Sequence, residues 1–485
     1  MQKYLFILGH NWRLALAEID TLLQIPKYYG KIVDYSANTA VVEFEEPEVS
    51  NKILTDLMIR LGTVQKIGIM LDFVDKVTIE DAFPTDMEAN REKIYDARNH
   101  LENTLADVAR DIFGDPTGQN LFVANSIYPI EFNDAYYPVL IKYFLQFTNK
   151  FFNKHLKEKG AKKALYYQYP QESIDKGNLN PIFPHHFAKY KLYEPGRAEI
   201  LYCQTEEGMY IGHTITVTDS NLQKQMDEER PFKDFRQTIP PKFAKALLSF
   251  LSLKPPLNQL KILDPFCGTG TTLMFALMQG MDVYGADLRE DRITGTRQNL
   301  QYVAELCEMD LPQADLERKI VISDVKKLHQ HFKAESFDGI ISEPVLLPYY
   351  RELPKFEEVQ EEVQNNVLPV YKTLLEQAIK LLKVGRRIGL VSPIINTVEN
   401  KPIKLPLKKI AKALGFEIID LMRVGRIQEK SSRSLNIRDQ MERTLFDKGS
   451  ERISREFYIF EKITAVPKVK TEKKPFRFTS ESDNE

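Results

Sequence analysis

Residues 264–271 read Asp-Pro-Phe-Cys-Gly-Thr-Gly-Thr and directly follow the apolar run Leu-Lys-Ile-Leu at 260–263. This order predicts a strand that ends in a glycine-rich turn and continues as a helix over residues 271–278. Gly268 and Gly270 carry no Cβ, so a ligand can approach the backbone closely at both positions. We call residues 264–271 the glycine turn and expect it to receive a nucleotide-like ligand.

The spacing within the glycine turn distinguishes between kinds of nucleotide-like ligand. Leu273 stands where the third glycine of a dinucleotide-binding fingerprint belongs, and no Gly-Lys-Ser/Thr follows as in a phosphate-binding loop. What remains is a turn suited to S-adenosylmethionine (SAM), which has no pyrophosphate to place at a helix N-terminus. We therefore predict a SAM site whose cofactor-binding residues include Asp264, Phe266, Gly268 and Gly270.

Acids follow the later strands at the same relative position. Three predicted strands end beside an acid: 281–286 at Asp287, 319–322 at Asp324 and 337–341 at Glu343. Ligands of open α/β sheets bind at the carboxyl ends of the strands, so Asp287 is expected to meet ribose hydroxyls and Asp324 the adenine amino group. Each acid also has an alternative interpretation as a helix cap or a solvated loop residue. The alternation of strands and helices predicts a doubly wound, mainly parallel, Rossmann-like sheet.

Length and composition limit the class of protein. A chain of 485 residues exceeds the size of one hydrophobic core, so two or more domains are expected. Hydrophobic residues make up 43% and charged residues 28%, and no apolar run approaches membrane-spanning length. Cys203, Cys267 and Cys307 lack the spacing of metal ligands or of a disulfide framework. We expect a cytoplasmic protein with no membrane or metal partner, in which Cys267 is a packing residue.

The N-terminal half predicts an α+β region. Short strands and helices alternate over residues 1–71, an acidic, irregular stretch covers 72–90, and a long polar helix begins at 91. The expected domains are an α+β subdomain at 1–90, a second α+β domain at 91–215, a linker at 216–237, the doubly wound domain at 238–463 and a disordered tail at 464–485.

Residues 142–163 are strongly basic, with seven lysines against one acid, interleaved with five aromatic residues. The pattern is typical of an amphipathic helix with a buried aromatic face and solvated lysines. A basic face also binds RNA phosphates, and one helix can do both. The candidate RNA-binding residues are Lys150, Lys154, Lys157, Lys162 and Lys163. Residues 423–438 are basic as well and predict a mobile insertion that touches substrate or a solvated loop.

Four parts of the chain resemble the THUMP-containing, SAM-dependent RNA methyltransferases. They are residues 3–6 with 14–19, residues 60–68, residues 230–232 with 241–247, and the glycine turn. The resemblance is closest to the branch that methylates the 2-amino group of guanosine 10 in tRNA. It implies that residues 91–215 are a THUMP-like RNA-binding domain and that a methyl group passes from SAM to a guanine exocyclic amine in tRNA. It implies tRNA as a partner and leaves open the need for a small activating protein.

The chain departs from this family where the fourth strand of the doubly wound sheet ends. The family has Asp-Pro-Pro followed by an aromatic residue, whereas residues 343–346 here read Glu-Pro-Val-Leu. The resemblance implies that Glu343 accepts a hydrogen bond from the target amine, that Pro344 shapes the motif, and that Tyr349 or Tyr350 stacks on the base. Three interpretations stay open: a working guanine methyltransferase, a SAM-binding methyltransferase acting on another RNA or DNA amine, and a non-catalytic RNA-binding protein that retains the fold.

Overall fold

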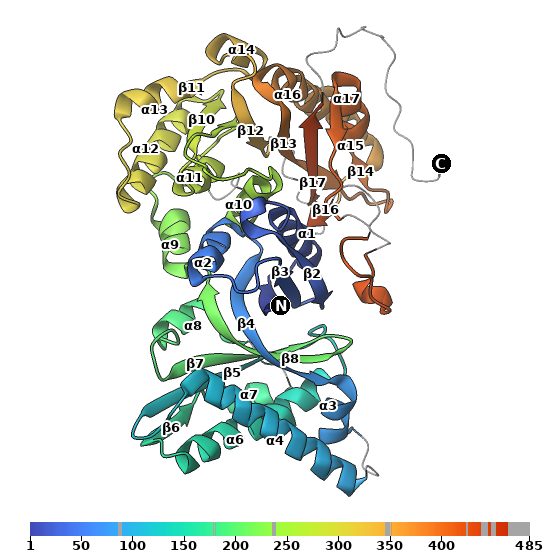
Figure 1. Cartoon of the computed structure of the whole chain (residues 1–485). Coiled ribbons are helices and arrows are strands. Elements are labelled where there is room, and N and C mark those ends of the chain that lie inside the picture. The colour runs from blue at the N-terminus through green and yellow to red at the C-terminus, as the bar shows by residue number, and fades with distance from the viewer. Residues whose placement is uncertain are drawn as a thin grey trace. The chain divides into compact units, whose positions relative to one another are not determined.

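A computed structural model describes residues 1–85, 90–177, 179, 181–234, 239–344, 350, 352–422, 425–437, 445–447 and 453–463. The chain divides into two compact units (Figure 1). Unit 1 comprises Met1–Gln223 with Arg423–Asp439, and unit 2 comprises Lys224–Met422 with Gln440–Glu485. None of the described helices combines the length and the apolarity that a bilayer span requires.

Within its described residues, unit 1 contains an eight-stranded sheet in the order β2-β3-β1-β4-β8-β7-β5-β6. The strands are β1 (Lys3–Leu8), β2 (Gly30–Tyr35), β3 (Thr39–Phe44), β4 (Val64–Asp75), β5 (Asn120–Tyr128), β6 (Lys163–Tyr166), β7 (Arg197–Gln204) and β8 (Gly208–Val217). Neighbours are antiparallel from β2 to β7, and β5 runs parallel to both β7 and β6. Because β4 pairs with β8 from Lys66 to Asp75, the strands on either side of residue 90 belong to one sheet.

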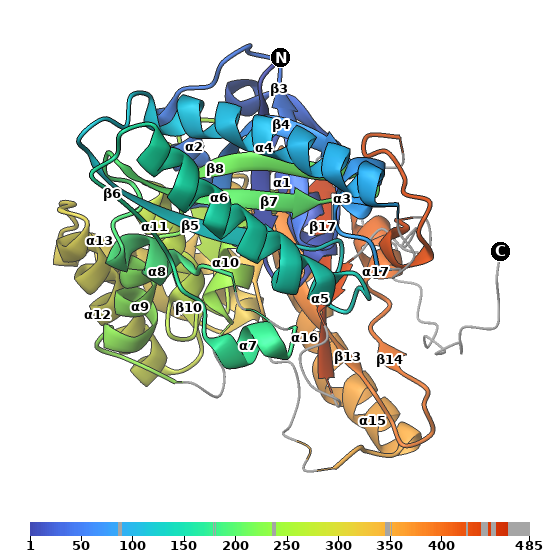
Figure 2. The ribbon, with the colours of Figure 1, turned by 90° about the horizontal axis from the view of Figure 1, so that it is seen from below.

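The helices of unit 1 include a pair that covers one face of this sheet. The helices are α1 (Trp12–Leu22), α2 (Asn51–Arg60), α3 (Lys76–Ala82), α4 (Arg91–Phe113), α5 (Tyr137–Val139), α6 (Leu145–Glu158), α7 (Gln171–Asp175), α8 (Pro184–Lys189) and, at the boundary of the units, α9 (Ser220–Lys224). In Figure 2, α4 and α6 run across β5, β7 and β8. Leu101 and Leu105 of α4 and Phe152 of α6 share a buried cluster with Tyr202 of β7, so apolar burial holds both helices on the sheet.

Residues 72–82, part of the stretch expected to be irregular, are regular in the structure. Strand β4 continues to Asp75, and α3 follows where an irregular stretch was expected. The Asp75 side chain accepts hydrogen bonds from the Thr78 amide at 3.0 Å and the Thr78 hydroxyl at 2.6 Å. This N-cap explains why a helix begins directly after the strand, in a segment whose composition alone indicated a loop.

Residues 425–437 belong to unit 1, although the segments before and after them in the sequence belong to unit 2. Arg426 pairs with Asp20 at 2.8 Å, and Lys430 pairs with the buried carboxylate of Asp34. The Tyr35 hydroxyl donates to the carbonyl of Leu435, which is fully buried. The sequence predicted either a mobile insertion or a solvated loop for this segment. The ion pairs and the buried leucine make it an ordered part of unit 1.

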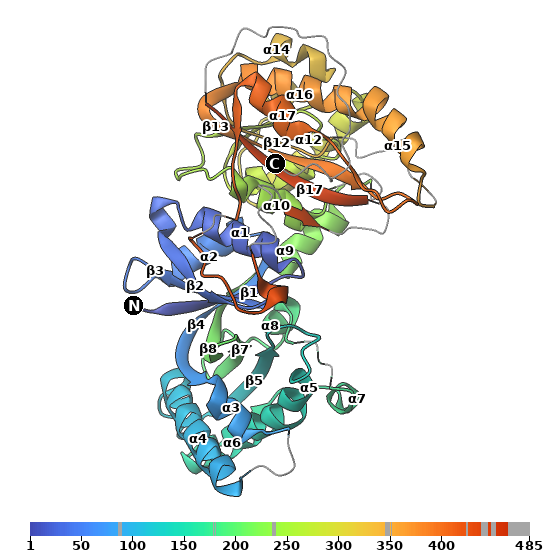
Figure 3. The same ribbon diagram turned by 90° about the vertical axis from the view of Figure 1, so that its right-hand side faces the viewer.

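The described residues of unit 2 build a nine-stranded sheet in the order β11-β10-β9-β12-β13-β17-β15, with β14 beside β13 and β16 beside β17. The strands are β9 (Lys261–Asp264), β10 (Asp282–Asp287), β11 (Ile320–Ile322), β12 (Phe337–Ser342), β13 (Leu382–Ile395), β14 (Ile403–Lys404), β15 (Phe416–Ile418), β16 (Leu445–Asp447) and β17 (Ile453–Lys462). The run from β11 to β13 is parallel, and β17 is antiparallel to both of its main neighbours. Figure 3 shows β13 and β17 side by side. The predicted doubly wound, mainly parallel sheet is confirmed.

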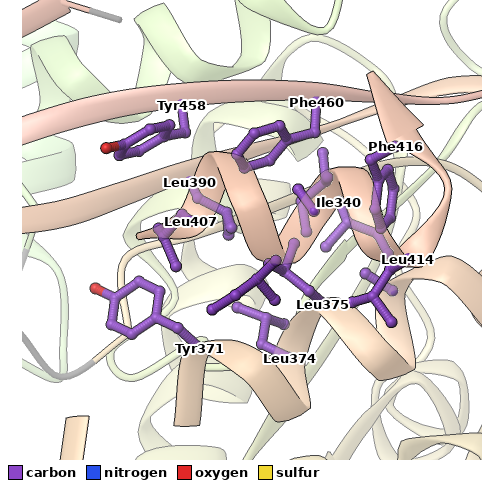
Figure 4. Packing of buried hydrophobic residues seen from close by; sticks show 14 of the residues in the cluster. Ile340, Tyr371, Leu374, Leu375, Leu390, Leu407, Leu414, Phe416, Tyr458 and Phe460 are labelled. Carbon is purple, nitrogen blue, oxygen red and sulfur yellow. The ribbon is translucent and has the colours of Figure 1, made fainter. Parts of the chain in front are cut away.

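Helices cover both faces of the unit 2 sheet. They are α10 (Pro241–Phe250), α11 (Thr271–Met278), α12 (Glu290–Leu306), α13 (Gln313–Lys319), α14 (Leu328–His331), α15 (Phe356–Glu362), α16 (Leu368–Leu381) and α17 (Leu407–Leu414). Leu247 of α10 lies against Gly389 of β13, whereas the next residue, Leu390, packs towards Leu374 and Leu375 of α16 (Figure 4). Successive residues of a strand point to opposite faces, so the sheet is buried on both sides, as parallel strands require.

The strand order places β9 at the centre of the parallel run. The chain moves from β9 outward to β10 and β11, and then returns to the other side of β9 with β12 and β13. The carboxyl ends of β9 and β12 therefore flank the topological switch point, which is where ligands bind in open α/β sheets. The glycine turn follows β9, and Glu343 follows β12.

Candidate active site

The glycine turn joins β9 to α11 through two residues in left-handed conformations. Gly268 has a φ of 53° and Gly270 a φ of 80°. A Cβ on Gly270 would lie 2.9 Å from Cγ2 of Thr296, whereas a Cβ on Gly268 would meet nothing nearer than 3.9 Å. Gly270 is thus required by both conformation and packing, and the backbone at Gly268 borders open space that a ligand can approach.

Side chains of α12 stabilise the glycine turn through hydrogen bonds to its backbone carbonyls. The Thr296 hydroxyl donates to the carbonyl of Gly268 at 2.8 Å, and Nδ2 of Asn299 donates to the carbonyl of Thr269 at 2.8 Å. Cys267 is buried, and burial raises the pKa of its thiol well above the ordinary value. The thiol is therefore protonated, which fits the expected packing role. The role of Asn299 in supporting the turn was not predicted, because a single asparagine within a helix carries no sequence signal.

Residues 230–232 contact the end of the same turn at Thr271 and the α12 residue Asn299 that supports it. Arg230 is 1% exposed, and its Nη1 donates to the Thr271 hydroxyl at 2.7 Å. The backbone amide of Phe232 donates to Oδ1 of Asn299 at 2.9 Å, and the carbonyl of Phe232 accepts from Nδ2 at 2.8 Å. This segment falls within the linker predicted at 216–237, and in the structure it is an integral part of unit 2.

Asp264, the last residue of β9, is a buried carboxyl at the floor of the site. It is 3% exposed and accepts hydrogen bonds from the Phe266 amide and the Ser342 hydroxyl, both at 3.1 Å. Burial raises the pKa of Asp264 to about 7, and no cationic side chain of the described residues pairs with it. A ligand cation would stabilise its ionised form at this position.

The other two predicted cofactor acids follow β10 and β11, and they differ in their contacts. Asp287 accepts from the Gly268 amide at 3.1 Å and from the Arg289 amide at 3.0 Å, so its carboxylate lies against the glycine turn. Asp324 accepts from the Lys326 amide at 2.9 Å and caps a short helical turn. Among the described residues, the capping interpretation therefore applies to Asp324, while Asp287 is brought to the turn.

Glu343 follows β12, and its carboxylate is held by a cation from β17. Nε of Arg455 donates to Oε1 of Glu343 at 2.6 Å, and the two side chains are 21% and 9% exposed. Burial raises the pKa of Glu343, and the neighbouring Arg455 opposes that rise. No signal in the sequence identified Arg455, which lies 112 residues from its partner. Pro344 follows Glu343, and Tyr349 lies outside the described residues.

One pocket brings the glycine turn and Glu343 together. It is lined by Ile239, Asp264, Phe266, Cys267, Gly268, Thr269, Thr271, Thr272 and Glu343. The space in it that the centre of a water-sized sphere can reach is about 30 Å³. The carboxyl groups of Asp264 and Glu343 and the backbone of Gly268 thus border one common space.

The predicted RNA-binding lysines lie in unit 1. Lys150, Lys154 and Lys157 are exposed on α6, and Lys162 and Lys163 are exposed just beyond it. Phe152 and Leu156 of the same helix are buried, as the amphipathic interpretation requires. Nδ2 of Asn153 donates to the carbonyl of Ala164 at 2.6 Å and joins α6 to β6, so the five lysines belong to one connected part of unit 1.

These features define the class of the protein. A doubly wound sheet with an antiparallel β17, a glycine turn after its central strand and acids beyond the neighbouring strands together make unit 2 a Rossmann-like methyltransferase domain. Within the part of the chain that the structure describes, no group of three or more His, Cys, Asp or Glu side chains is arranged to hold a metal ion.

Comparisons with known proteins agree with this class. Residues 230–383 match the family described as RMKL-like, methyltransferase domain, and residues 63–298 match the DNA methylase family. Over 157 residues the chain is 27% identical to tRNA (guanine(10)-N2)-dimethyltransferase of Pyrococcus abyssi, which is 32% of this chain and 42% of that protein. Over 132 residues it is 29% identical to U6 snRNA (guanine-N(2))-methyltransferase THUMPD2 of Homo sapiens, which is 27% of this chain and 21% of that protein.

The matches thus span less than half the length of these curated relatives. The crystal structure of TrmN from Thermus thermophilus aligns over 95% of this chain and 100% of that one, with 15% identity and a TM-score of 0.46. The sequence matches confirm the resemblance to the THUMP-containing RNA methyltransferases.

Proposed function

We propose that this protein transfers a methyl group from SAM to the exocyclic N2 amine of a guanine in RNA, with guanosine 10 of tRNA as its substrate. The observation that carries the proposal is the pocket in which Glu343 faces the same space as Asp264 and Gly268. The names of the relatives, which act on guanine N2 in tRNA or U6 snRNA, support the choice of atom and of nucleic acid.

The residues around the glycine turn fit SAM. Gly268 borders open space, and Asp264 is a buried carboxyl with no cationic partner among the described residues, while SAM carries an ammonium and a sulfonium. We infer that Asp264, Phe266, Gly268, Gly270 and Asp287 hold the cofactor, and that Asp324, whose Oδ1 caps a helical turn, meets the adenine amino group through its second oxygen. SAM, when bound, supplies an electrophilic methyl group. The protein's own contribution is to bind, orient and exclude water.

Glu343 acts on the nucleophile. The lone pair of a guanine amine is delocalised into the ring, so the amine reacts poorly unless acceptors hold its hydrogens and turn the lone pair towards the methyl group. Oε1 of Glu343 is engaged by Arg455, while no described residue donates to Oε2. Oε2 would accept a hydrogen bond from the amine, hold its lone pair towards the methyl group that SAM would supply, and take up the proton that the methylated amine releases. Pro344 shapes this segment, and the stacking role of Tyr349 stays a proposal.

Unit 1 supplies RNA binding in this scheme. The exposed lysines on and after α6 give a basic surface suited to phosphates, and residues 91–215 would form the THUMP-like domain. A small activating protein stays a proposed partner. The cysteines, all free in the structure, support a reducing, cytoplasmic setting.

Two assays on the full chain test the proposed function. Calorimetry measures SAM binding, and mass spectrometry of nucleosides measures methylation of unmodified tRNA transcripts that carry guanosine or adenosine at position 10. We expect N2-methylguanosine with the guanosine transcript, none with the adenosine transcript, and none with Glu343→Ala despite normal SAM binding. A wild-type protein that does not bind SAM leaves only a non-catalytic RNA-binding role.

The match of residues 63–298 to the DNA methylase family favours a second candidate, methylation of a DNA amine. A single-stranded DNA oligonucleotide assayed beside the tRNA distinguishes the two, since a flipped or unpaired base is what such enzymes require. Methylation of the DNA and not of the tRNA would replace the first proposal with the second.

A matched pair of charge changes tests the RNA-binding surface. Lys150, Lys154 and Lys157 changed together to alanine should weaken tRNA binding and lower the slope of log affinity against log salt by about 0.9 per lost phosphate contact. The control removes three exposed lysines of α17, Lys408, Lys409 and Lys412, and should leave that slope unchanged. Equal losses in both variants would contradict a dedicated surface on α6.

A further inference from the structure

We propose that Arg455 is a positioning residue for methyl transfer, which aims the free oxygen of Glu343 into the pocket beside the glycine turn. This inference rests on the proposed function and adds a residue that neither the glycine turn nor the residues at 343–346 identify. Its starting point is the 2.6 Å contact between Nε of Arg455 and Oε1 of Glu343.

The guanidinium is itself fixed from two directions. Arg455 lies on β17 opposite Pro393 of β13, so its backbone is locked in the sheet. Its Cζ lies 5.9 Å from the ring centroid of Phe243, a buried residue of α10. A planar cation against an aromatic face has few orientations open to it, so its hydrogen bond to Oε1 has a defined direction.

Position 343 needs such a partner because it carries a glutamate. Its side chain has one more rotatable bond than the aspartate of the family motif, and an unpaired glutamate would spread its carboxylate over several rotamers. The ion pair with Arg455 selects one arrangement in which Oε1 is occupied. No described residue donates to Oε2, and Glu343 lines the pocket. The pair thus leaves one oriented acceptor for an amine.

The pair also sets the charge of the acceptor. Burial alone favours a protonated carboxyl, which is a poorer acceptor than a carboxylate, and Arg455 counters that effect on the pKa of Glu343. Among the described residues, the other titratable groups that share the pocket with Glu343 or interact with it are the Asp264 carboxyl from β9, the Cys267 thiol of the glycine turn and the Tyr371 phenol from α16; Cys267, like the other two, carries no positive charge. Of these groups, therefore, Arg455 alone stabilises the ionised glutamate.

The test compares Arg455→Met and Arg455→Lys with a matched control. Arg387→Met breaks another arginine–glutamate pair that also involves β17, in which Nε of Arg387 on β13 lies 3.1 Å from Oε2 of Glu461. The measurements are kcat for methyl transfer to tRNA from pH 5.5 to 9, the KM for tRNA, the Kd for SAM and the thermal unfolding temperature of each full-length protein.

With Arg455→Met, the acid limb of the kcat profile should move up by about 1–3 pH units, because Glu343 then ionises only at higher pH. At a pH on that limb, kcat should fall about 10-fold for each pH unit of the displacement. The KM for tRNA and the Kd for SAM should stay near wild type. Arg455→Lys keeps the charge and should keep the acid limb in place, with only a reduced kcat. The Arg387→Met control should lose stability without any change in the profile.

The outcomes separate this inference from the proposed function. A wild-type protein that binds SAM but methylates no RNA overturns the proposed function and the role of Arg455 with it. An active wild type whose Arg455→Met variant retains both kcat and the acid limb overturns the role of Arg455 alone. If Arg455→Met does not fold, Arg455→Lys decides. Because lysine keeps the positive charge, an acid limb that moved up in Arg455→Lys by the roughly 1–3 pH units expected for loss of the cation would contradict the inference.

Discussion

The glycine turn and the end of β12 lie at the carboxyl ends of neighbouring parallel strands, yet their geometry has different origins. β9 and β12 pair through Leu263 and Ile340. Consecutive residues set the turn, because its glycines adopt left-handed conformations that other residues reach only with strain. Glu343 is set at long range, by Arg455 on β17. A backbone cradle is thus encoded locally, whereas a distant strand fixes the direction and charge of the proposed acceptor.

Of the changes that test this comparison, shortening Glu343 should have the largest effect, a loss of methyl-transfer rate. Glu343→Asp restores the family's residue type but withdraws the carboxylate from Arg455. Because a misplacement of about 1 Å can cost on the order of 100-fold in rate, we expect kcat to fall by about that factor. The glycine turn is untouched, so the affinity for SAM should not change. Single-turnover transfer of a radiolabelled methyl group and calorimetry measure the two quantities.

Glu461→Asp is the matched control for that change. Glu461 lies on β17 and pairs with Arg387, and the same methylene is removed without touching the pocket. Its methyl transfer should equal that of the wild type. Full activity of Glu343→Asp would mean that the carboxylate does not depend on Arg455 for its position, and the contrast between local and long-range encoding would fail.

Gly270→Ala changes the locally encoded glycine turn. It should lower the affinity for SAM and leave kcat unchanged. The alanine Cβ would lie 2.9 Å from Cγ2 of Thr296 at a φ of 80°. Strain of about 1–3 kcal/mol at such a residue corresponds to a roughly 5- to 150-fold loss of SAM affinity if the turn relaxes by moving. Calorimetry at a temperature at which the variant is fully folded measures this loss of SAM affinity.

Gly280→Ala provides an unusually close control for the glycine turn. Gly280 has a φ of 85° just after α11, and a Cβ there meets nothing within 4 Å. Its backbone cost is therefore similar, without the crowding of the turn. We expect lower stability and unchanged SAM affinity. An equal loss of SAM affinity in both variants would show that general destabilisation, and not the shape of the turn, is being measured.

The same difference explains what could be predicted from the sequence. The helix predicted over 271–278 coincides with α11, because the apolar run, the two glycines and the apolar residues after them are local signals for strand, turn and helix. The contact of Arg455 with Glu343, in contrast, depends on the order of β12, β13 and β17 in the sheet, which no spacing reveals. Likewise, nothing near Asn299 in the sequence shows that its side chain reaches Phe232 and Thr269.

Asn299→Ala probes that hidden support of the turn and should have a moderate effect. The change removes the hydrogen bonds to the carbonyls of Thr269 and Phe232 and leaves buried backbone groups unsatisfied. We expect a loss of about 1–3 kcal/mol in the free energy of unfolding, measured by urea denaturation, and a few-fold weaker SAM binding. Gln301→Ala on the same helix is the control, since its side chain donates to Glu305 of α12. Unchanged SAM binding in Asn299→Ala would mean that the turn holds its shape unaided.

Protonation of Asp264 provides a pH-dependent test of how the two acids of the pocket differ. Its folded-state pKa is raised from 3.8 to about 7 by burial, so its contribution to stability is fully present below the unfolded value and is lost as the pH rises through about 7. Relative to Asp264→Asn, the wild type should lose unfolding free energy between pH 4 and 8.

Bound SAM, as a cation, favours the ionised form of Asp264, so SAM binding near pH 7 should release a fraction of a proton. Calorimetry in buffers of different ionisation enthalpy measures that release. Glu343 shares the pocket but has Arg455 beside it. If the Asp264→Asn variant showed the same pH dependence as the wild type, the titrating acid would lie elsewhere, and the two acids would not differ in the way their partners imply.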